Sequence, residues 1–288
     1  MDILKCEAFL KAVDTGSLSQ AAMELGYTPS GVTRMVNALE AELGFPLLSR
    51  NSKGVTVTTD GGRMLPILRE MVRCNELAFQ TSAEIRGLSV GNLMIGAFYS
   101  VASSWLPKII KAFQADYPKI YVNTLECSDD VLLEWLEEGR IDCCFFSNGN
   151  ANSDWIPLKM DKVVVWLPKD HPNANLAAFP IRDFAGAPYI ETMQGSDPLI
   201  KSLAELDEFS PDVRFTTRDF YTTYAMVSAG LGISVNNELL GKNWSGDVVI
   251  LPLDPPRYLP IGIVVKSLKD ASPATKKFID CARRLMKD

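Results

Sequence analysis

The chain has 288 residues, a length at which about two domains are expected. Apolar residues make up 47% of the sequence and charged residues 22%, which is typical of globular proteins and excludes a collagen-like or largely disordered chain. The net charge of -6 argues against indiscriminate binding of nucleic acid or membranes, because such binding depends on a positive field.

The first sixty residues predict short helices followed by a small hairpin. Apolar side chains recur every three or four residues from Ile3 to Val13, which indicates a helix with one buried face. Ser17 is a typical N-cap for a second helix. Gly26 is expected to end that helix, because glycine accepts the left-handed conformation that follows many helices.

The sequence predicts the residue at which the third helix begins. Thr28 is a good N-cap, and Pro29 stands at the first helical position, where its missing N–H costs nothing. One face is apolar, and the opposite face carries small polar groups and one arginine: Pro29, Ser30, Thr33, Arg34 and Asn37. Any amphipathic helix has a polar face. Two helices joined by a tight turn are nevertheless the arrangement with which a helix-turn-helix reads the major groove of DNA.

A two-stranded wing is predicted after this helix. A turn falls between Asn51 and Gly54, and alternating side chains follow from Val55 to Thr58. Arg50 and Lys53 lie at this hairpin, where a phosphate backbone would run if the third helix lay in the groove. The hairpin therefore strengthens the DNA-binding interpretation.

Three consecutive segments carry a family pattern: F-L-x-A-V-x-T-G-S-L-S-x-A-A-x-x-L over 9–25, T-P-S-G-V-T-R-M-V-N-A-L-E-x-E-L-G over 28–44, and P-L-L-x-R-x-x-x-G-V-x-V-T-x-x-G over 46–61. Residues 1–65 thus resemble the winged helix-turn-helix of the LysR-type transcriptional regulators. The resemblance implies a DNA-binding domain over 1–61. The DNA contacts that it implies are Thr28, Pro29, Ser30, Thr33, Arg34, Arg50 and Lys53, and the polar face of the third helix adds Asn37.

Three positions depart from the usual family pattern. Gly31 stands where alanine is common, Pro29 replaces a frequent glutamine, and Leu48 replaces the usual phenylalanine. Loss of the glutamine removes an amide suited to adenine. These departures put the DNA half-site in doubt and leave the mode of binding in place.

Residues 62–90 predict a linker helix and a hinge. The helix carries two apolar stripes, one of Leu65, Leu68, Val72 and Phe79 and one of Met64, Ile67, Met71, Ala78 and Ile85. One stripe suits the winged domain and the other a partner helix, while a core helix inside one domain is the alternative. The resemblance implies that this helix pairs two copies, so a homodimer is expected, assembled into a dimer of dimers in related proteins.

Residues 91–288 alternate strands and helices, which predicts an α/β domain with parallel strand pairing. Strands are expected at 92–96, 120–126, 141–146, 162–167, 188–191, 213–216, 233–235 and 259–266, and helices at 104–117, 129–138, 221–229 and after Ser272. The two halves resemble a periplasmic-binding-protein fold. We expect subdomain I to cover about 91–161 and 267–288, and subdomain II about 162–266.

Ligands in such folds lie between the halves, where strands end and helices begin. The candidate effector-binding residues follow that rule: Ser100, Val101, Ser103, Ser128, Ser147, Asn148, Thr192, Met193, Phe220, Tyr221 and Thr222. Capping or turn formation is the alternative role for each of them. Nearby aromatic residues are compatible with a ring-bearing or largely apolar effector, although a place in the core is expected for most of them. Arg218 is interpreted as a surface residue, and pairing with an effector carboxylate is the alternative.

Histidine and cysteine usage limits the chemistry. The single histidine, His171, excludes a cage of several histidines around a metal. Six cysteines are scattered without a C-x-x-C pair, which is typical of a reducing compartment, and Cys127 alone has a position suited to a redox sensor. With no signal-peptide core and no long apolar run, we expect a cytoplasmic protein without catalytic residues, metal or cofactor.

The predicted function is that of a LysR-type, sequence-specific DNA-binding transcriptional regulator, whose promoter contacts change when a small-molecule effector binds between the two subdomains. The expected partners are double-stranded promoter DNA, the effector and further copies of the chain, with no membrane. A solute-binding protein or another non-catalytic sensor of this fold is the alternative, but the winged domain counts against it. An enzyme is disfavoured, because no cluster of titratable groups or nucleotide-binding loop is present.

Overall fold

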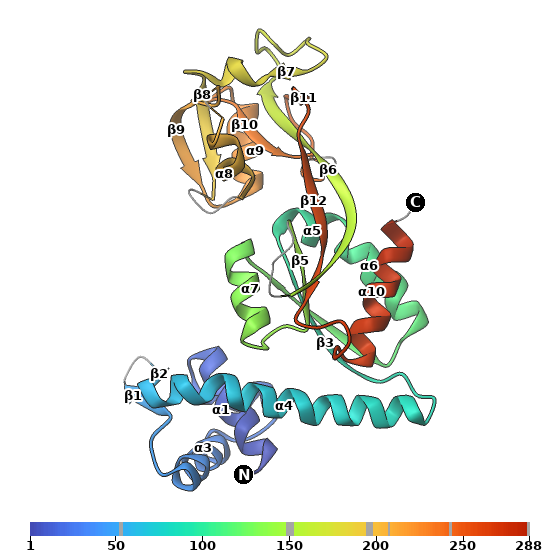
Figure 1. Ribbon diagram of the computed structural model, residues 1–288. Coiled ribbons are helices and arrows are strands. Elements are labelled where there is room, and N and C mark those ends of the chain that lie inside the picture. The colour runs from blue at the N-terminus through green and yellow to red at the C-terminus, as the bar shows by residue number, and fades with distance from the viewer. Residues whose placement is uncertain (52–53, 148–152, 194–197, 207, 242–243, 287–288) are drawn as a thin grey trace.

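The computed structural model describes residues 1–51, 54–147, 153–193, 198–206, 208–241 and 244–286. Three parts follow one another: a helical unit with a hairpin, one long helix, and an elongated α/β part made of two subdomains (Figure 1). The long helix lies across the subdomain I end of the α/β part, away from subdomain II (Figure 1). The fold class predicted from the sequence is confirmed.

The N-terminal unit forms because its helix ends are capped locally and its apolar faces share one core. Its elements are α1 Ile3–Thr15, α2 Leu18–Leu25, α3 Pro29–Leu43, and the hairpin β1 Leu48–Asn51 with β2 Gly54–Val57. The predicted caps are confirmed: Ser17 and Thr28 each accept a backbone N–H, and Gly26 is left-handed. Phe9, Leu39 and Leu47 are fully buried in this core, which we call the winged core.

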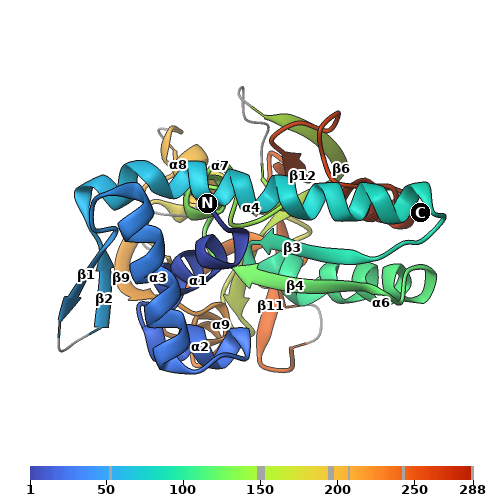
Figure 2. The same cartoon turned by 90° about the horizontal axis from the view of Figure 1, so that it is seen from below.

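The long helix α4, Thr59–Ile85, joins the winged core along its first half. Its start lies so close to the hairpin that a Cβ on Gly61 would be 2.3 Å from the Leu47 carbonyl oxygen. The second half extends beside the α/β part, where β3 and α10 contact it (Figure 2).

The two apolar stripes of α4 do not separate as expected. Met64, Leu65, Leu68, Met71 and Val72, drawn from both stripes, all contact the winged core. Ile67, Phe79 and Ile85, also from both stripes, remain exposed. The residues that contact the winged core lie on one face of the helix that takes members from both predicted stripes, whereas Ile67 lies outside that face although it is in the first half.

Subdomain I has parallel strands covered by helices on both faces. Its elements are β3 Gly91–Ala97, α5 Tyr99–Ser104, α6 Leu106–Asp116, β4 Ile120–Glu126, α7 Asp129–Glu137, β5 Cys143–Phe146 and the final helix α10 Pro273–Met286. Its core gathers Phe113, Phe145 and Phe278.

Subdomain II is joined to subdomain I by two long antiparallel strands, β6 Asp154–Pro168 and β12 Tyr258–Val265 (Figure 1). Its further elements are β7 Phe179–Pro180, a 3₁₀ turn at Ile181–Phe184, β8 Pro188–Thr192, α8 Pro198–Ala204, β9 Asp212–Thr217, α9 Phe220–Ser228, β10 Ser234–Asn237 and β11 Val248–Asp254. The main sheet has the order β4-β3-β5-β12-β6-β11-β7, with β10 beside β6, while β8 and β9 pair separately.

The structure differs from the sequence prediction at several elements. The helix expected over 104–117 corresponds to α6 and is preceded by the separate short helix α5, while α8, β7 and β11 had no predicted counterpart. Ile261, Ile263 and Val265 of β12 pack in the core of subdomain I. We therefore propose that the chain re-enters subdomain I within β12 rather than after residue 266. No helix in the described ranges combines the length and apolar character needed to cross a membrane.

Candidate DNA-reading surface and effector cavity

The start of α3 presents the predicted polar face to solvent. Thr28, Pro29, Ser30, Arg34 and Asn37 are exposed and Thr33 is half-buried. The Thr28 hydroxyl accepts a hydrogen bond from the Gly31 N–H at 3.1 Å, and Thr33 Oγ1 donates to the Pro29 carbonyl at 2.8 Å. The two threonine side chains therefore stabilise the helix start, whereas Arg34 has no ion-pair partner among the described residues.

The wing arginine is tied to the same helix. Arg50 Nη2 donates to Asn37 Oδ1 and lies 3.6 Å from a carboxylate oxygen of Glu40. Glu40 also accepts the backbone N–H groups of Leu47 and Leu48, at 2.7 and 2.9 Å. These bonds fix the wing against α3, so Arg50 and Asn37 position each other. The candidate Lys53 lies outside the described residues.

A cluster at Asp14 joins three parts of the chain, and no sequence motif indicated it. Asp14 of α1 accepts two hydrogen bonds from Arg69 of α4, from Nη2 at 2.6 Å and from Nη1 at 3.4 Å. Nε of Arg140, which follows α7 in subdomain I, lies 3.7 Å from the same carboxylate. The Arg140 guanidinium also stacks 4.8 Å above the ring centroid of Trp135.

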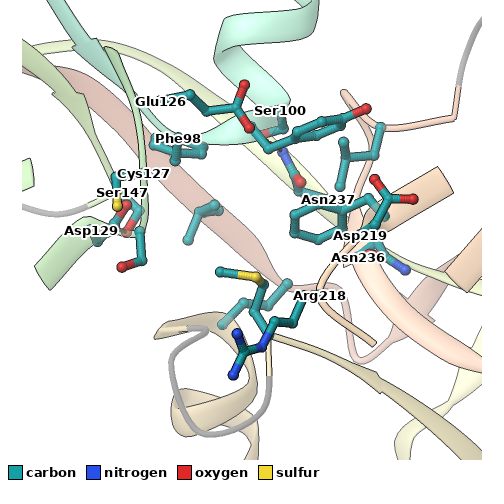
Figure 3. Close-up of a pocket in the computed structure, with 17 residues that line it drawn as sticks. Phe98, Ser100, Glu126, Cys127, Asp129, Ser147, Arg218, Asp219, Asn236 and Asn237 are labelled. Atoms are coloured by element: carbon teal, nitrogen blue, oxygen red, sulfur yellow. Dashed lines mark hydrogen bonds between the residues drawn. The ribbon is translucent and has the colours of Figure 1, made fainter. Parts of the chain in front are cut away.

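A cavity of about 350 Å³ lies between the two subdomains. Its walls come from the starts of α5 and α7, the end of β4, and from β10 and the start of α9 on the other side (Figure 3). Apolar side chains such as Phe98, Leu199 and Leu240 share the lining with polar groups. This combination is typical of a small-molecule site.

Five of the predicted effector residues line this cavity: Ser100, Ser128, Ser147, Met193 and Phe220. Five others do not. Val101 is fully buried in the subdomain I core, and exposed Ser103 donates to the Tyr99 carbonyl. Thr192 is hydrogen-bonded to Thr223 in the interior, Tyr221 packs against Trp244, and the Thr222 hydroxyl donates to Asp219. Asn148 is not among the described residues.

Asn237 connects the subdomains at the cavity wall. Its amide Nδ2 donates to Ser100 Oγ at 2.9 Å and to Asp161 Oδ2 at 2.7 Å. Within the described ranges, Ser100 Oγ itself donates no hydrogen bond, although the residue is only 3% exposed. A buried hydroxyl with a free donor can hold a ligand acceptor. On another wall, Ser147 donates to the buried carboxylate of Asp129.

Two aromatic rings meet across the cleft. Tyr99 of α5 and Phe220 of α9 stack with centroids 5.1 Å apart and planes 29° apart. Burial, and then the negative charges of Asp219 and Glu126, raises the pKa of the Tyr99 phenol. Burial, and then the charge of Asp219, likewise raises the pKa of the Glu126 carboxyl. The carboxylates of Asp219 and Glu126 therefore both act on the Tyr99 side of the ring pair.

The other lining residues were not among the predicted effector contacts: Phe98, Tyr99, Glu126, Cys127, Asp129, Leu199, Arg218, Asp219, Asn236, Asn237, Leu240 and Leu259. The strand-end rule, applied one or two residues before Ser128, identifies Cys127 and Glu126. Nothing in the sequence separates Leu240 or Leu259 from ordinary core leucines. Arg218, interpreted as a surface residue, is exposed and lines the cavity.

The cysteines divide by burial. Cys143 and Cys144 are fully buried, and burial raises the pKa of Cys144 to about 12, so its thiol stays protonated at neutral pH. Cys127 alone lies in the cavity wall. Among the described residues, no three His, Cys, Asp or Glu side chains gather as metal ligands.

Comparison with known proteins gives consistent matches. A family model described as "LysR substrate binding domain" matches residues 86–287, and one described as "Bacterial regulatory helix-turn-helix protein, lysR family" matches residues 4–62. The "Uncharacterized HTH-type transcriptional regulator YvbU" of Bacillus subtilis is 31% identical over 99% of both chains.

Solved structures share the whole fold. A full-length OxyR variant from Pseudomonas aeruginosa aligns with a TM-score of 0.75 at 18% identity, over 98% of this chain and 95% of that one. Full-length CbnR in complex with its target DNA aligns with a TM-score of 0.69 at 20% identity, over 99% of both chains. At these identities the two structures establish the fold.

Proposed function

The chain belongs to the LysR family of bacterial transcriptional regulators, and on that premise we propose that a small molecule in the cavity between the subdomains controls its contacts with promoter DNA. One observation carries the proposal. Both subdomains contribute walls to the same cavity, so a bound molecule contacts both and favours one relative arrangement of them. A ligand that binds one arrangement better shifts the protein toward it.

The Asp14 cluster supplies a physical connection from the cavity to the winged unit. Ser128 and Asp129, at the start of α7, line the cavity. Arg140, just beyond the end of the same helix, faces Asp14 of α1. Because a helix moves as a rigid element, a shift of α7 at the cavity alters the position of Arg140 beside the winged unit.

On the DNA side, we propose that α3 enters the major groove with Arg34 reaching base edges or phosphates. The exposed residues Thr28, Pro29, Ser30 and Arg34, with half-buried Thr33 among them and Arg50 and Asn37 at the edge, support this placement. We keep Lys53 as a proposed contact from the sequence alone. Residues 1–63 carry six basic and seven acidic side chains. Their field is therefore local, and specific contacts from two paired winged units must supply much of the affinity.

We propose that the pairing uses α4. Phe79 is 70% exposed and Ile85 is 82% exposed. Large apolar side chains exposed along one helix are typical of a surface that another protein covers. A dimer would cover these side chains and set the spacing of the two winged units. Assembly of two dimers into a tetramer is the extension that the family resemblance implies.

Phe79→Ser should weaken this dimer, because it replaces an exposed apolar ring with a hydroxyl and leaves the winged core untouched. We expect the dimer dissociation constant to rise at least about tenfold, since burial of one aromatic ring contributes about 1.5–3 kcal/mol. Sedimentation velocity over a concentration series measures it. Tyr121→Ser, at a ring that is 72% exposed on β4, is the matched control. Equal self-association of Phe79→Ser and the unmodified chain would remove Phe79 from the interface.

Ser100→Ala tests the cavity. A thermal-shift screen of the full chain against metabolites identifies compounds that bind the native state, since such compounds raise its Tm. For those compounds, we expect Ser100→Ala to reduce affinity about 3- to 10-fold, because a hydrogen bond contributes about 0.5–1.5 kcal/mol. DNA binding without the compound should be unchanged. Ser103→Ala removes a hydroxyl from the exposed side of the same helix and should have no effect. Equal affinity in all three proteins would exclude Ser100 from the site.

A further inference from the structure

The aromatic pair Tyr99–Phe220 is flanked by carboxylates from both subdomains. Glu126 ends β4 and Asp219 precedes α9, and both line the cavity (Figure 3). Asp219 Oδ1 accepts hydrogen bonds from Thr222, whereas Glu126 has no hydrogen-bond or ion-pair partner in the described part of the chain. No lysine or arginine in the described part of the chain forms an ion pair with either carboxylate.

These two carboxylates interact across the cleft. The charge of Asp219 adds to burial in raising the pKa of Glu126, and both charges act on the Tyr99 phenol. Arg218 is the one basic residue of the cavity wall in the described ranges, and it extends away from Glu126 toward the opposite side (Figure 3). The aromatic end of the cavity therefore carries two solvent-exposed carboxylates, in addition to the buried carboxylate of Asp129 on another wall, and a positive ligand group there would relieve their repulsion.

The ring pair itself favours a cation. The face of an aromatic ring carries negative charge density, and ammonium groups near such faces gain about 0.5–2 kcal/mol. Tyr99 comes from subdomain I and Phe220 from subdomain II, so a group bound beside their stack touches both halves.

From the two carboxylates without a basic partner among the described residues and the ring pair beside them, we propose that the effector is an aromatic amine that binds in its protonated form. This inference rests on the proposed function of the cavity and specifies its ligand class. The ammonium lies near Glu126 and Asp219, and the ring packs on the apolar wall formed by residues such as Phe98 and Leu240. A ring compound with a carboxylate instead would meet two like charges at that end.

Three probes share a phenyl ring with two further carbons and differ in the charge of the terminal group: 2-phenylethylamine, 2-phenylethanol and phenylacetate. Comparing them distinguishes the contribution of the charge to affinity from that of the ring. Titration calorimetry on the full chain at pH 7 measures each affinity. We expect the amine to bind at least about tenfold more tightly than the other two. Glu126→Gln should reduce amine affinity about tenfold, as loss of one charge-assisted contact predicts. The matched control Glu134→Gln removes an exposed carboxylate from α7 and should change nothing.

The outcomes are distinct. Tighter binding of phenylacetate, undetectable binding of the amine at millimolar concentration, or an unchanged amine affinity in Glu126→Gln would each overturn the amine class. Phenylacetate binding that weakens in Ser100→Ala would overturn the class while supporting the cavity as the effector site. A cavity that binds no small molecule in the metabolite screen would contradict the proposed function itself.

Discussion

Replacing Arg34 with alanine should weaken binding to the protein's own promoter about 10- to 100-fold. Arg34 is exposed at the start of α3 and has no ion-pair partner among the described residues, so its guanidinium is available to DNA. Loss of an arginine that contacts a base edge costs about 1–3 kcal/mol, which sets the expected range. Fluorescence anisotropy with a labelled promoter fragment measures the affinity, and footprinting shows the protected region.

The matched control removes the same charge from an exposed arginine in another part of the chain. Arg182 is exposed in subdomain II and lies 3.8 Å from its neighbour Asp183. Arg182→Ala should leave promoter affinity unchanged at the same salt concentration. Because both arginines are exposed, both variants should have the same free energy of unfolding as the unmodified chain. Unaltered protection by Arg34→Ala would show that α3 is not the recognition helix.

Replacing Asp14 with alanine should lower the free energy of unfolding of the winged unit by about 3 kcal/mol, because the change leaves a buried arginine unpaired. The Arg69 side chain is 6% exposed, and its Nε already lacks a partner among the described residues. Urea unfolding followed by circular dichroism measures the change. Asp60→Ala removes an exposed carboxylate 4.0 Å from Arg63 and should cost less than about 1 kcal/mol.

A double variant tests whether the loss of stability comes from the unpaired charge of Arg69 or from other effects of the Asp14 substitution. Asp14→Ala with Arg69→Leu removes both charges and leaves an apolar side chain against the winged core. Much of the lost stability should return, as expected when both members of a buried ion pair are removed. Equal stability of the single and double variants would contradict the assignment of the loss to Arg69.

The winged unit was predictable because its determinants are local. Thr28, Pro29 and Gly44 define the ends of α3 through bonds within a few residues, so spacing in the sequence fixes the face on which Arg34 lies. The pairing of Arg50 with Asn37 was not predictable. It depends on the angle at which the hairpin returns toward α3, which Glu40 sets by binding backbone N–H groups beyond the helix.

The cavity was predictable only in part. The rule that ligands lie at strand ends found Ser100, because the first turn of a helix after a parallel strand faces the cleft. It failed at Val101 and Ser103, since neighbouring helical residues point about 100° apart and only some of them face the cleft. It missed Leu259, which no pattern distinguishes from a core residue and which reaches the cavity on a strand that crosses between subdomains.

The exposed face of α3 with its arginine and the alternation of strands and helices after residue 91 could be read from the residues alone, because caps and hydrophobic periodicity act over a few positions. The order of the parts and the two-subdomain architecture were implied by the resemblance to the LysR family. Which charges are paired and which stay unpaired required the folded molecule. Asp14, Arg69 and Arg140 meet from three separate elements, whereas Glu126 and Asp219 interact across the cleft without a counterion among the described residues. Such juxtapositions depend on how whole elements pack, and no local pattern records them.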